Sequence, residues 1–506
     1  MTLKASTTKL RLPIFLFLLS FVLFIAFRIF DLTRIPVFVD EAIYIRWSQI
    51  MRNEPSLRFL PLSDGKQPLF MWATMPALKI FSDPLIAGRM VSIAAGFLSL
   101  TGLAFLVFVS TGNLLLAASA SLVYSVLPFA VFFDRMALAD SLLAAFGIWS
   151  LALGALLTKK ARLDLALLLG FAIGFGLLTK SPAIFFYAWQ LIIFLFLFDF
   201  RGPGLRPRLT KLFASWFVVF LLSQAIYNIL RLGPNFHLIG SRNQDYVFSL
   251  KEVLSHPANP LMGNLKTTTF WLWFLFTPPL FLVSFFSFLG KHKKPALIFF
   301  LISLSTLFVQ AALAKVYTSR YILFAALPLI VPVALGLSEL GERLRKHWLA
   351  LFVFLLWPAI LSAVIIAMPE KANLPFDMRS GYLEEWTAGW GQKEIAAYLI
   401  DRAKAGEKIV VGTDGFFGTL PDGLVIYTQG QPGITVIGGS PSITSLPESL
   451  TDSLLDKANT VYLVANASRV NLPPSEKERL ELIAEYPKPA RLDGTHESLL
   501  FYQLTH

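Results

Sequence analysis

The stretch IPVFVDEAIYIRWSQ, Ile35 to Gln49, places two adjacent carboxylates, Asp40 and Glu41, just after the first long apolar run of the chain. A carboxylate at this point is expected where the membrane ends and water begins. There it is partly desolvated and can still be reached by a substrate arriving from either phase. We therefore take this pair as the candidate chemical centre and the apolar runs around it as its scaffold.

The composition is that of a membrane protein. Of the 506 residues, 55% are hydrophobic and 47 are Phe, which excludes an ordinary soluble enzyme. The formal charge of +12 is explained first by basic cytoplasmic loops, so no nucleic acid is expected as a partner. Because the chain has no Cys, it can form neither disulfides nor thiolate metal sites, and it has no Cys nucleophile.

Eleven apolar runs of about 17 to 25 residues are predicted to cross the membrane. The first, Pro13 to Phe30, follows Lys4, Lys9 and Arg11 and precedes no small-residue cleavage site, so it is expected to be an uncleaved helix with a cytoplasmic N-terminus. The others are expected near residues 85–109, 113–133, 137–157, 163–178, 182–200, 212–230, 268–289, 295–313, 320–340 and 348–368. The chain is thus predicted to be a polytopic α-helical protein of the cell membrane.

Basic clusters between the apolar runs support this topology. Four segments that the count places in the cytoplasm contain Lys159, Lys160 and Arg162; Arg201, Arg206, Arg208 and Lys211; Lys291, Lys293 and Lys294; and Arg343, Arg345 and Lys346. The outer loops 31–84 and 231–266 and the tail are then extracytoplasmic. Within the first loop, the apolar stretch Gln67 to Phe81 is expected to lie on the membrane surface, because a crossing there would invert every later cluster.

Residues 369–506 are predicted to form a small extracytoplasmic α/β domain, separate from the membrane domain 1–368. The expected helices are Gln392 to Lys404, Ser449 to Lys457 and Ser475 to Tyr486; the expected strands are Lys408 to Gly412, Leu424 to Thr428, Ile434 to Ile437, Thr460 to Val464 and Leu499 to Leu504. Their alternation predicts a largely parallel sheet. The glycine-rich GTDGFFG, Gly412 to Gly418, has the wrong spacing for a dinucleotide site and is expected to be a turn.

Ionisable residues gather at the predicted outer ends of the spans, where burial costs up to roughly 3 kcal/mol each. They are Asp40, Glu41, Arg89, Asp134, Arg135, Asp140, Lys180, Lys315 and Arg320. Cations of this kind suit a phosphate, and carboxylates suit removal of a proton from a hydroxyl or amine. Two alternatives remain: each cation could simply form an ion pair, for instance Arg135 with Asp134, and Asp40 could be a helix cap for the segment that follows it.

Six motifs in succession resemble those of GT-C glycosyltransferases, in particular the branch of protein O-mannosyltransferases and lipid A aminoarabinose transferases. They are VDEAIYIRWSQ after the first span, KQPLFMW at Lys66 to Trp72, AGRMVSIAAG at Ala87 to Gly96, FFDRMALADSLL at Phe132 to Leu143, LLTKSP at Leu177 to Pro182 and TSRYILFAALP at Thr318 to Pro328. The resemblance covers roughly Arg11 to Met368. The first loop departs from it, since KQP stands where the aminoarabinose branch has a basic residue followed by two prolines.

The resemblance implies a polyprenyl-phosphate sugar as donor and transfer on the extracytoplasmic side. It implies inversion at the anomeric carbon, with Asp40 as the base and Glu41 in support, while Lys180 and Arg320 hold the lipid phosphate. The residues expected to bind substrate are Lys66, Arg89, Arg135, Asp140, Lys180, His237, Arg320 and Tyr321. No cofactor and no metal ligand are assigned. Metal dependence stays open, since Glu41 and His237 are side-chain types that bind a divalent cation.

Two other classes of function are weighed against this one. A polytopic transporter or flippase for a lipid-linked substrate would also place charges in spans, although it would favour midplane sites, broken helices and paired halves. A binding scaffold would need far fewer spans. The sequence names neither the sugar nor the acceptor, which could be a protein, a lipid or a glycan.

Overall fold

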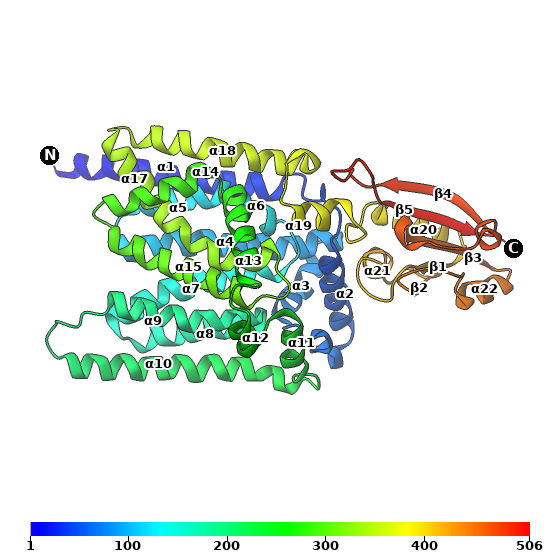
Figure 1. Ribbon diagram of the computed structural model, residues 1–506, viewed down its shortest axis with the longest axis horizontal. Helices are drawn as coiled ribbons and strands as arrows, with labels where there is room; N and C mark the ends of the chain where they lie inside the picture. The colour runs from blue at the N-terminus through cyan, green and yellow to red at the C-terminus, as the bar shows by residue number, and fades with distance from the viewer. Residues whose placement is uncertain (1, 506) are drawn as a thin grey trace. The chain divides into compact units, whose positions relative to one another are not determined.

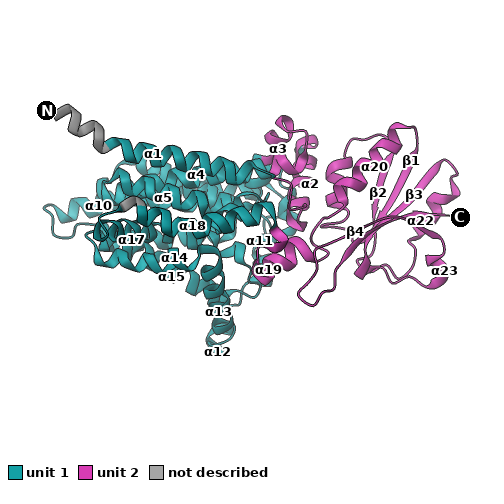
Figure 2. Ribbon diagram, turned by 90° about the horizontal axis from the view of Figure 1, so that it is seen from above, with its two compact units in different colours: residues 1–31, 55–73, 89–368 teal, residues 32–54, 74–88, 369–506 magenta. Residues whose placement is uncertain are grey.

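The computed structural model describes residues 2–505, and Figure 1 labels the helices and strands. The chain divides into two compact units, which Figure 2 shows in different colours. Unit 1 is Met1–Asp31, Pro55–Ala73 and Arg89–Met368; unit 2 is Leu32–Glu54, Thr74–Gly88 and Pro369–His506. Two pieces of the first outer loop therefore belong to the same compact unit as the C-terminal tail.

Unit 1 is built from helices that extend beside one another (Figure 1). They are α1 Thr2–Ile29, α4 Pro84–Thr111, α5 Leu114–Val126, α6 Pro128–Asp134, α7 Ala139–Lys160, α8 Leu163–Thr179, α9 Phe185–Leu197, α10 Leu205–Tyr227, α11 Leu238–Tyr246, α12 Leu250–Ser255, α13 Leu261–Trp271, α14 Pro278–Ser284, α15 Lys293–Leu313, α16 Leu323–Ala326, α17 Ile330–Arg343 and α18 His347–Ala367. Helix α3, Leu69–Ile80, and helix α4 are each divided between the two units, the first turn of α4 belonging to unit 2. The side chains of Lys4 and Lys9, on which the expected orientation of the first span partly rests, lie outside the described residues.

Seven helices within residues 2–505 are long and apolar enough to cross a membrane, and two bent helix pairs bring the number to as many as nine. The bent pairs are Leu114–Val126 with Pro128–Asp134, at 61°, and Leu261–Phe276 with Pro278–Leu289, at 103°. The multi-pass α-helical class is confirmed, but the predicted count of about eleven is not reached. Two predicted spans fall in the shorter helices Leu163–Thr179 and Ser181–Leu197, which are separated by Lys180. The second begins with a 3-10 turn that contains Pro182.

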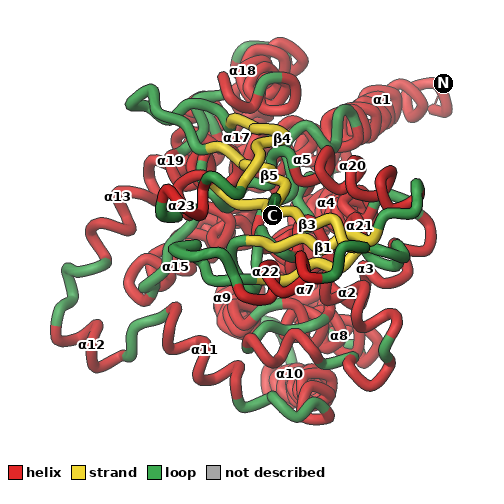
Figure 3. The backbone as a smooth tube through the Cα atoms, turned by 90° about the vertical axis from the view of Figure 1, so that its right-hand side faces the viewer, coloured by secondary structure: helices red, strands yellow, loops and turns green. Residues whose placement is uncertain are grey.

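Unit 2 contains a five-stranded sheet, drawn in yellow in Figure 3. Its strands are β1 Lys408–Thr413, β2 Ile434–Gly438, β3 Asn459–Asn466, β4 Leu480–Pro487 and β5 Ser498–Leu504, and its helices are α2 Val39–Asn53, α19 Phe376–Arg379, α20 Gln392–Lys404, α21 Asp422–Thr428, α22 Glu448–Leu455 and α23 Pro474–Lys477. The strand order is β2-β1-β3-β5-β4. Strand β1 pairs in parallel with β2 and β3, whereas β5 pairs antiparallel with β3 and β4.

Both faces of the sheet are covered, because buried side chains alternate along the central strand β3. Tyr462 and Val464 pack with residues of α20 and α21 on one face. Val461, Leu463 and Ala465 pack with residues of α22 on the other. The result is a three-layer α/β unit, as predicted for the tail.

Three details of the predicted tail are wrong. The sheet is mixed rather than largely parallel, because β4 and β5 form an antiparallel hairpin. Leu424 to Thr428 is part of helix α21, since its apolar side chains pack on the sheet as a helix in spite of their β-branching. Ser475 to Tyr486, predicted as one helix, is the short α23 followed by strand β4. The segment Gly412 to Gly418 is the end of β1 and a turn, with Gly415 and Gly418 at positive φ.

Candidate active site

The two adjacent carboxylates occupy the first turn of α2 in unit 2 and have different environments. Glu41 is fully buried, and its Oε2 accepts a hydrogen bond from the backbone N–H of Phe38 at 3.0 Å. Glu41 thereby caps its own helix, as the glutamate of a capping box does. Asp40 is half-buried. The structure therefore assigns the capping role that was weighed for Asp40 to Glu41.

In unit 1, four of the predicted substrate-binding residues come together. Lys180 Nζ lies 2.6 Å from Asp140 Oδ1 and 4.3 Å from the centre of the Tyr321 ring. The guanidinium carbon of Arg320 lies 5.1 Å from the centre of the same ring. Two cations thus share one aromatic ring, and one carboxylate pairs with Lys180. We call Asp140, Lys180, Arg320 and Tyr321 the cation cluster.

Four separate chain segments supply and support the cation cluster. Asp140 lies in the first turn of α7, and Lys180 follows the last residue of α8. Arg320 and Tyr321 lie in a 3-10 turn, Ser319–Ile322, and Gln310 of α15 donates a hydrogen bond to the Tyr321 carbonyl at 3.0 Å. Arginine and lysine in such an arrangement offer several N–H donors to an anion, with a planar fork from the guanidinium.

Arg135 is held differently from the cation cluster. Its guanidinium donates to the carbonyls of Phe27, Arg28, Phe30 and Asp31, which end helix α1. The carboxylate of Asp134 pairs with Arg28 at 3.1 Å, rather than with Arg135, and also accepts from Tyr124 and Ser141. Arg135 therefore supplies hydrogen-bond donors to backbone carbonyls at the end of α1. These contacts do not support its predicted role toward a phosphate.

The other predicted substrate-binding residues lie in elements next to these. Lys66 lies 3.1 Å from Asp64, which also pairs with Arg242 at 3.3 Å, and the neighbouring Gln67 donates to Ser181 at 2.7 Å. His237 is exposed and precedes α11. Arg89 is buried in α4, one turn before Ser92, whose hydroxyl donates to the Leu138 carbonyl. Their roles toward a substrate stay predictions.

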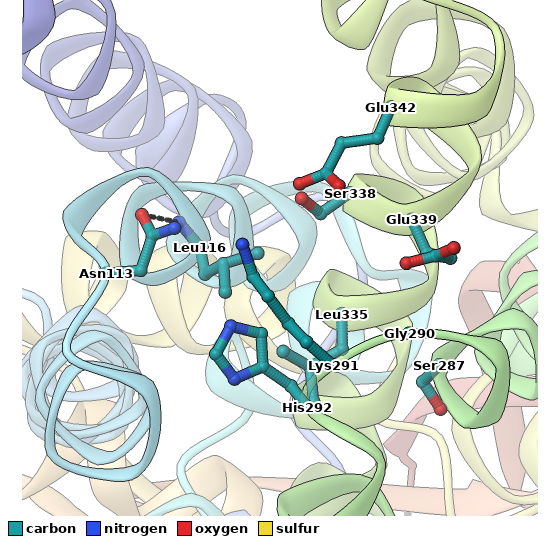
Figure 4. A pocket seen from close by; sticks show the side chains of 10 residues that line it. All are labelled: Asn113, Leu116, Ser287, Gly290, Lys291, His292, Leu335, Ser338, Glu339 and Glu342. Atoms are coloured by element: carbon teal, nitrogen blue, oxygen red, sulfur yellow. Dashed lines mark hydrogen bonds between the residues drawn. The ribbon is translucent and has the colours of Figure 1, made fainter.

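No group of three or more His, Cys, Asp or Glu side chains suited to a metal ion occurs in the part of the chain that the structure describes. A small pocket, shown in Figure 4, lies elsewhere in unit 1 and is lined by Asn113, Leu116, Ser287, Gly290, Lys291, His292, Leu335, Ser338, Glu339 and Glu342. Asn113 caps the start of α5, and Glu342 lies in the last turn of α17. The pocket therefore lies at the other end of these helices from Arg135 and Arg320. It contains none of the predicted site residues.

Several residues that support the site were missed in the sequence. Gln67, Ser181 and Gln310 are neutral and carry no pattern that predicts their long-range hydrogen bonds. Arg28 could have been found, because an arginine inside an apolar span is costly unless it is paired. It is fully buried against Asp134, with the Phe24 ring 4.4 Å away.

Comparison with known proteins agrees with this architecture. A family model described as dolichyl-phosphate-mannose-protein mannosyltransferase matches residues 65–227. Among curated proteins no significant match is found.

Solved structures with a similar fold include ArnT from Cupriavidus metallidurans bound to undecaprenyl phosphate, at 15% identity and a TM-score of 0.56 over 96% of this chain and 97% of that one. The apo state of ArnT gives 15% identity and a TM-score of 0.55 over 98% of both chains. The Archaeoglobus fulgidus oligosaccharyltransferase tethered with an acceptor peptide is less similar, at 12% identity and a TM-score of 0.49 over 98% of this chain and 74% of that one. The fold of this chain is thus similar to that of ArnT, and its segment 65–227 matches the mannosyltransferase family model.

Proposed function

We propose that this protein transfers a sugar, hexosyl or pentosyl, from a polyprenyl-phosphate donor to an extracytoplasmic hydroxyl or amine, with inversion at the anomeric carbon. The observation that carries the proposal is the cation cluster, in which Lys180 and Arg320 both contact the Tyr321 ring and Lys180 pairs with Asp140. Such a cluster suits the phosphate of a lipid donor. The undecaprenyl phosphate bound to ArnT, a protein of similar fold, supports the same class of donor.

In the proposed reaction, Asp40 accepts the proton of the acceptor hydroxyl or amine as that group attacks the anomeric carbon. The bond between this carbon and the phosphate oxygen breaks on the opposite face, and the electron pair leaves with the lipid phosphate. Lys180 and Arg320 stabilise the phosphate, whose charge rises as the bond breaks. No acid is needed to protonate this leaving group, because a phosphate is a stable anion. Glu41 supports the reaction by fixing the start of α2.

The orientation belongs to the proposal as well. With a cytoplasmic N-terminus, the four basic clusters between spans face the cytoplasm. Asp40, the cation cluster and the C-terminal α/β domain are then extracytoplasmic. The acceptor, whether protein, lipid or glycan, would be met on that side.

The test is transfer from a set of polyprenyl-phosphate sugars to a total membrane extract by the full-length protein in lipid. Arg320→Ala should weaken binding of undecaprenyl phosphate roughly tenfold to a hundredfold, because hydrogen bonds to charged groups contribute about 1.5–3 kcal/mol. The matched control is Arg162→Ala, which removes an exposed arginine paired with Asp164 in a predicted cytoplasmic loop. Equal affinity in Arg320→Ala and Arg162→Ala would contradict the phosphate site.

A transporter or flippase for a lipid-linked substrate is the second candidate, and one observation favours it. Two helix pairs of unit 1 are bent, by 61° and 103°, and broken helices are common around transport sites. A transporter would move labelled lipid across a vesicle membrane without any sugar reaching an acceptor. Sugar transfer that is lost in Asp40→Asn would exclude this reading.

A further inference from the structure

The three residues before Asp40, Val37 to Val39, are held by backbone contacts with another segment of unit 2. The Val39 N–H donates to the Thr387 carbonyl at 3.1 Å, and the Gly389 N–H donates to the Val37 carbonyl at 2.8 Å. Phe38 and Ala388 form an antiparallel bridge, and the Phe38 ring lies 4.2 Å from the Tyr382 ring. The loop Glu385 to Gly389, which we call the clasp loop, thus pairs with the chain just before α2.

The fit between the clasp loop and this segment is close. A Cβ at Gly389 would lie 2.5 Å from Val37 Cγ1 and 2.8 Å from the Val37 carbonyl oxygen. Contacts this short do not occur at real Cβ atoms, so a side chain here would displace Val37. Glycine is therefore required at position 389 for the backbone pairing to form.

Two cations anchor the clasp loop to the sheet of unit 2. Arg491 donates to both carboxylate oxygens of Glu385, at 2.7 and 2.9 Å. Lys488 donates from Nζ to the Glu385 carbonyl at 3.1 Å and to Asn466 Oδ1 at 2.7 Å. The amide of Asn466 in turn donates to Asp414 Oδ2 at 3.0 Å.

The position of Lys488 is unusual for a lysine. Asp414 directly follows β1 and Asn466 ends β3, so both lie at the carboxyl ends of two neighbouring parallel strands. In open α/β sheets this edge is the common place for a ligand. Here the chain places its own Lys488 there, only 4% exposed. Its charge faces Glu497, Asp414, Glu385 and Arg469.

We propose that Lys488, acting with Asn466, is a positioning residue for Asp40. It ties the clasp loop to the carboxyl edge of the sheet, and the clasp loop fixes Val37 to Val39, so the first turn of α2 presents Asp40 in one orientation. The catalytic part of this inference rests on the proposed role of Asp40. The C-terminal α/β domain would then contribute to the reaction without touching the substrate.

The experiment uses the full-length protein in lipid with Lys488→Met, and Lys404→Met, an exposed lysine of α20, as the matched control. In Lys488→Met, kcat for sugar transfer should fall roughly tenfold to a hundredfold while the KM for donor stays within about twofold, because misplacement of a catalytic group by about 1 Å has effects of this size. Lys488→Arg, which keeps the charge and the donors, should recover part of kcat. Lys404→Met should match the wild type.

Hydrogen exchange at the Val39 and Gly389 amides is the second readout, and it does not depend on transfer. Both amides should exchange faster in Lys488→Met, since they donate to the paired segment. Faster exchange with unchanged kcat, or a loss of kcat without faster exchange, would overturn the proposal. Absence of transfer in the wild type would refute the proposed function instead. Hydrogen exchange would still test whether Lys488 holds the clasp loop against Val37 to Val39.

A second pair of variants serves if Lys488→Met does not fold. Gly389→Ala should displace Val37 and reproduce both effects. Gly381→Ala is its control, because a Cβ there would lie 3.6 Å from the Phe38 ring, an ordinary contact. Equal kcat and equal exchange in the two alanine variants would overturn the proposal.

Discussion

The cation cluster of unit 1 and the start of α2 in unit 2 are held in opposite ways. The first turn of α7, the residue after α8 and the turn before α16 supply the cluster, and side-chain contacts among Asp140, Lys180 and Tyr321 hold it together. The carboxylates of α2 come from adjacent residues and are held by backbone hydrogen bonds of Phe38 and Val39. A substitution in the cluster therefore disturbs its neighbours, whereas a substitution of Asp40 leaves the supporting hydrogen bonds in place.

The sharpest test of this difference is Asp40→Asn, for which the largest effect is expected. Loss of a general base lowers kcat by about 10²–10⁴-fold. Donor affinity should stay that of the wild type and the unfolding temperature close to it, because the substitution keeps the hydrogen bond between the Phe38 N–H and Glu41. Glu54→Gln, at the exposed end of the same helix, is the control. A similar loss of kcat in Glu54→Gln would show that any change in charge on α2 is sufficient.

The dependence of stability on pH tests the environment of Lys488, which anchors the clasp loop, rather than the role of Asp40 in transfer. Burial lowers the pKa of Lys488 from its ordinary 10.5 to about 8, so between these values the unfolded chain binds more protons than the folded one. The free energy of unfolding should therefore rise with pH across this window, by up to about 3 kcal/mol. Chemical denaturation of the full-length protein at several pH values measures it. The rise should be absent in Lys488→Met, and an identical rise in both proteins would contradict the assignment.

The smallest effect is expected for Glu41→Gln, the matched partner of Asp40→Asn. Glutamine keeps an oxygen that accepts from the Phe38 N–H but removes the favourable charge at the helix N-terminus, a loss of about 0.3–1 kcal/mol. Transfer should fall by less than about fivefold, since 1.4 kcal/mol corresponds to tenfold. Thermal unfolding and the transfer assay measure the two quantities. A loss as large as that in Asp40→Asn would mean that the two carboxylates do not have the separate roles assigned to them.

The sequence predicted the membrane class and the α/β tail well, because long apolar runs and alternating segments are strong local signals. It failed where tertiary contacts override local pattern. Leu424 to Thr428 has strand-like residues and is helical, since it packs on α20 and the sheet. Strand β4 lies in a segment predicted to be a helix, because its glutamates and apolar residues recur at spacings that also fit a helix.

For the site, the charged members of the cation cluster could be predicted from the sequence, but the composition of unit 2 could not. Asp140, Lys180 and Arg320 could be predicted because charges at span ends are costly. That residues 32–54 form one compact unit with the tail could not be predicted, because the contacts are backbone pairs such as Val39 with Thr387. Backbone pairing between distant segments leaves no mark in the residue types.

The anomeric configuration of the transferred sugar tests the central claim, a single displacement assisted by Asp40, most directly. The product formed by the full-length protein from a polyprenyl-phosphate sugar of known configuration would be examined by NMR. The account predicts an inverted product, because one attack on the face opposite the leaving phosphate inverts the carbon. A retained configuration would contradict it, since retention requires two displacements and a covalent intermediate.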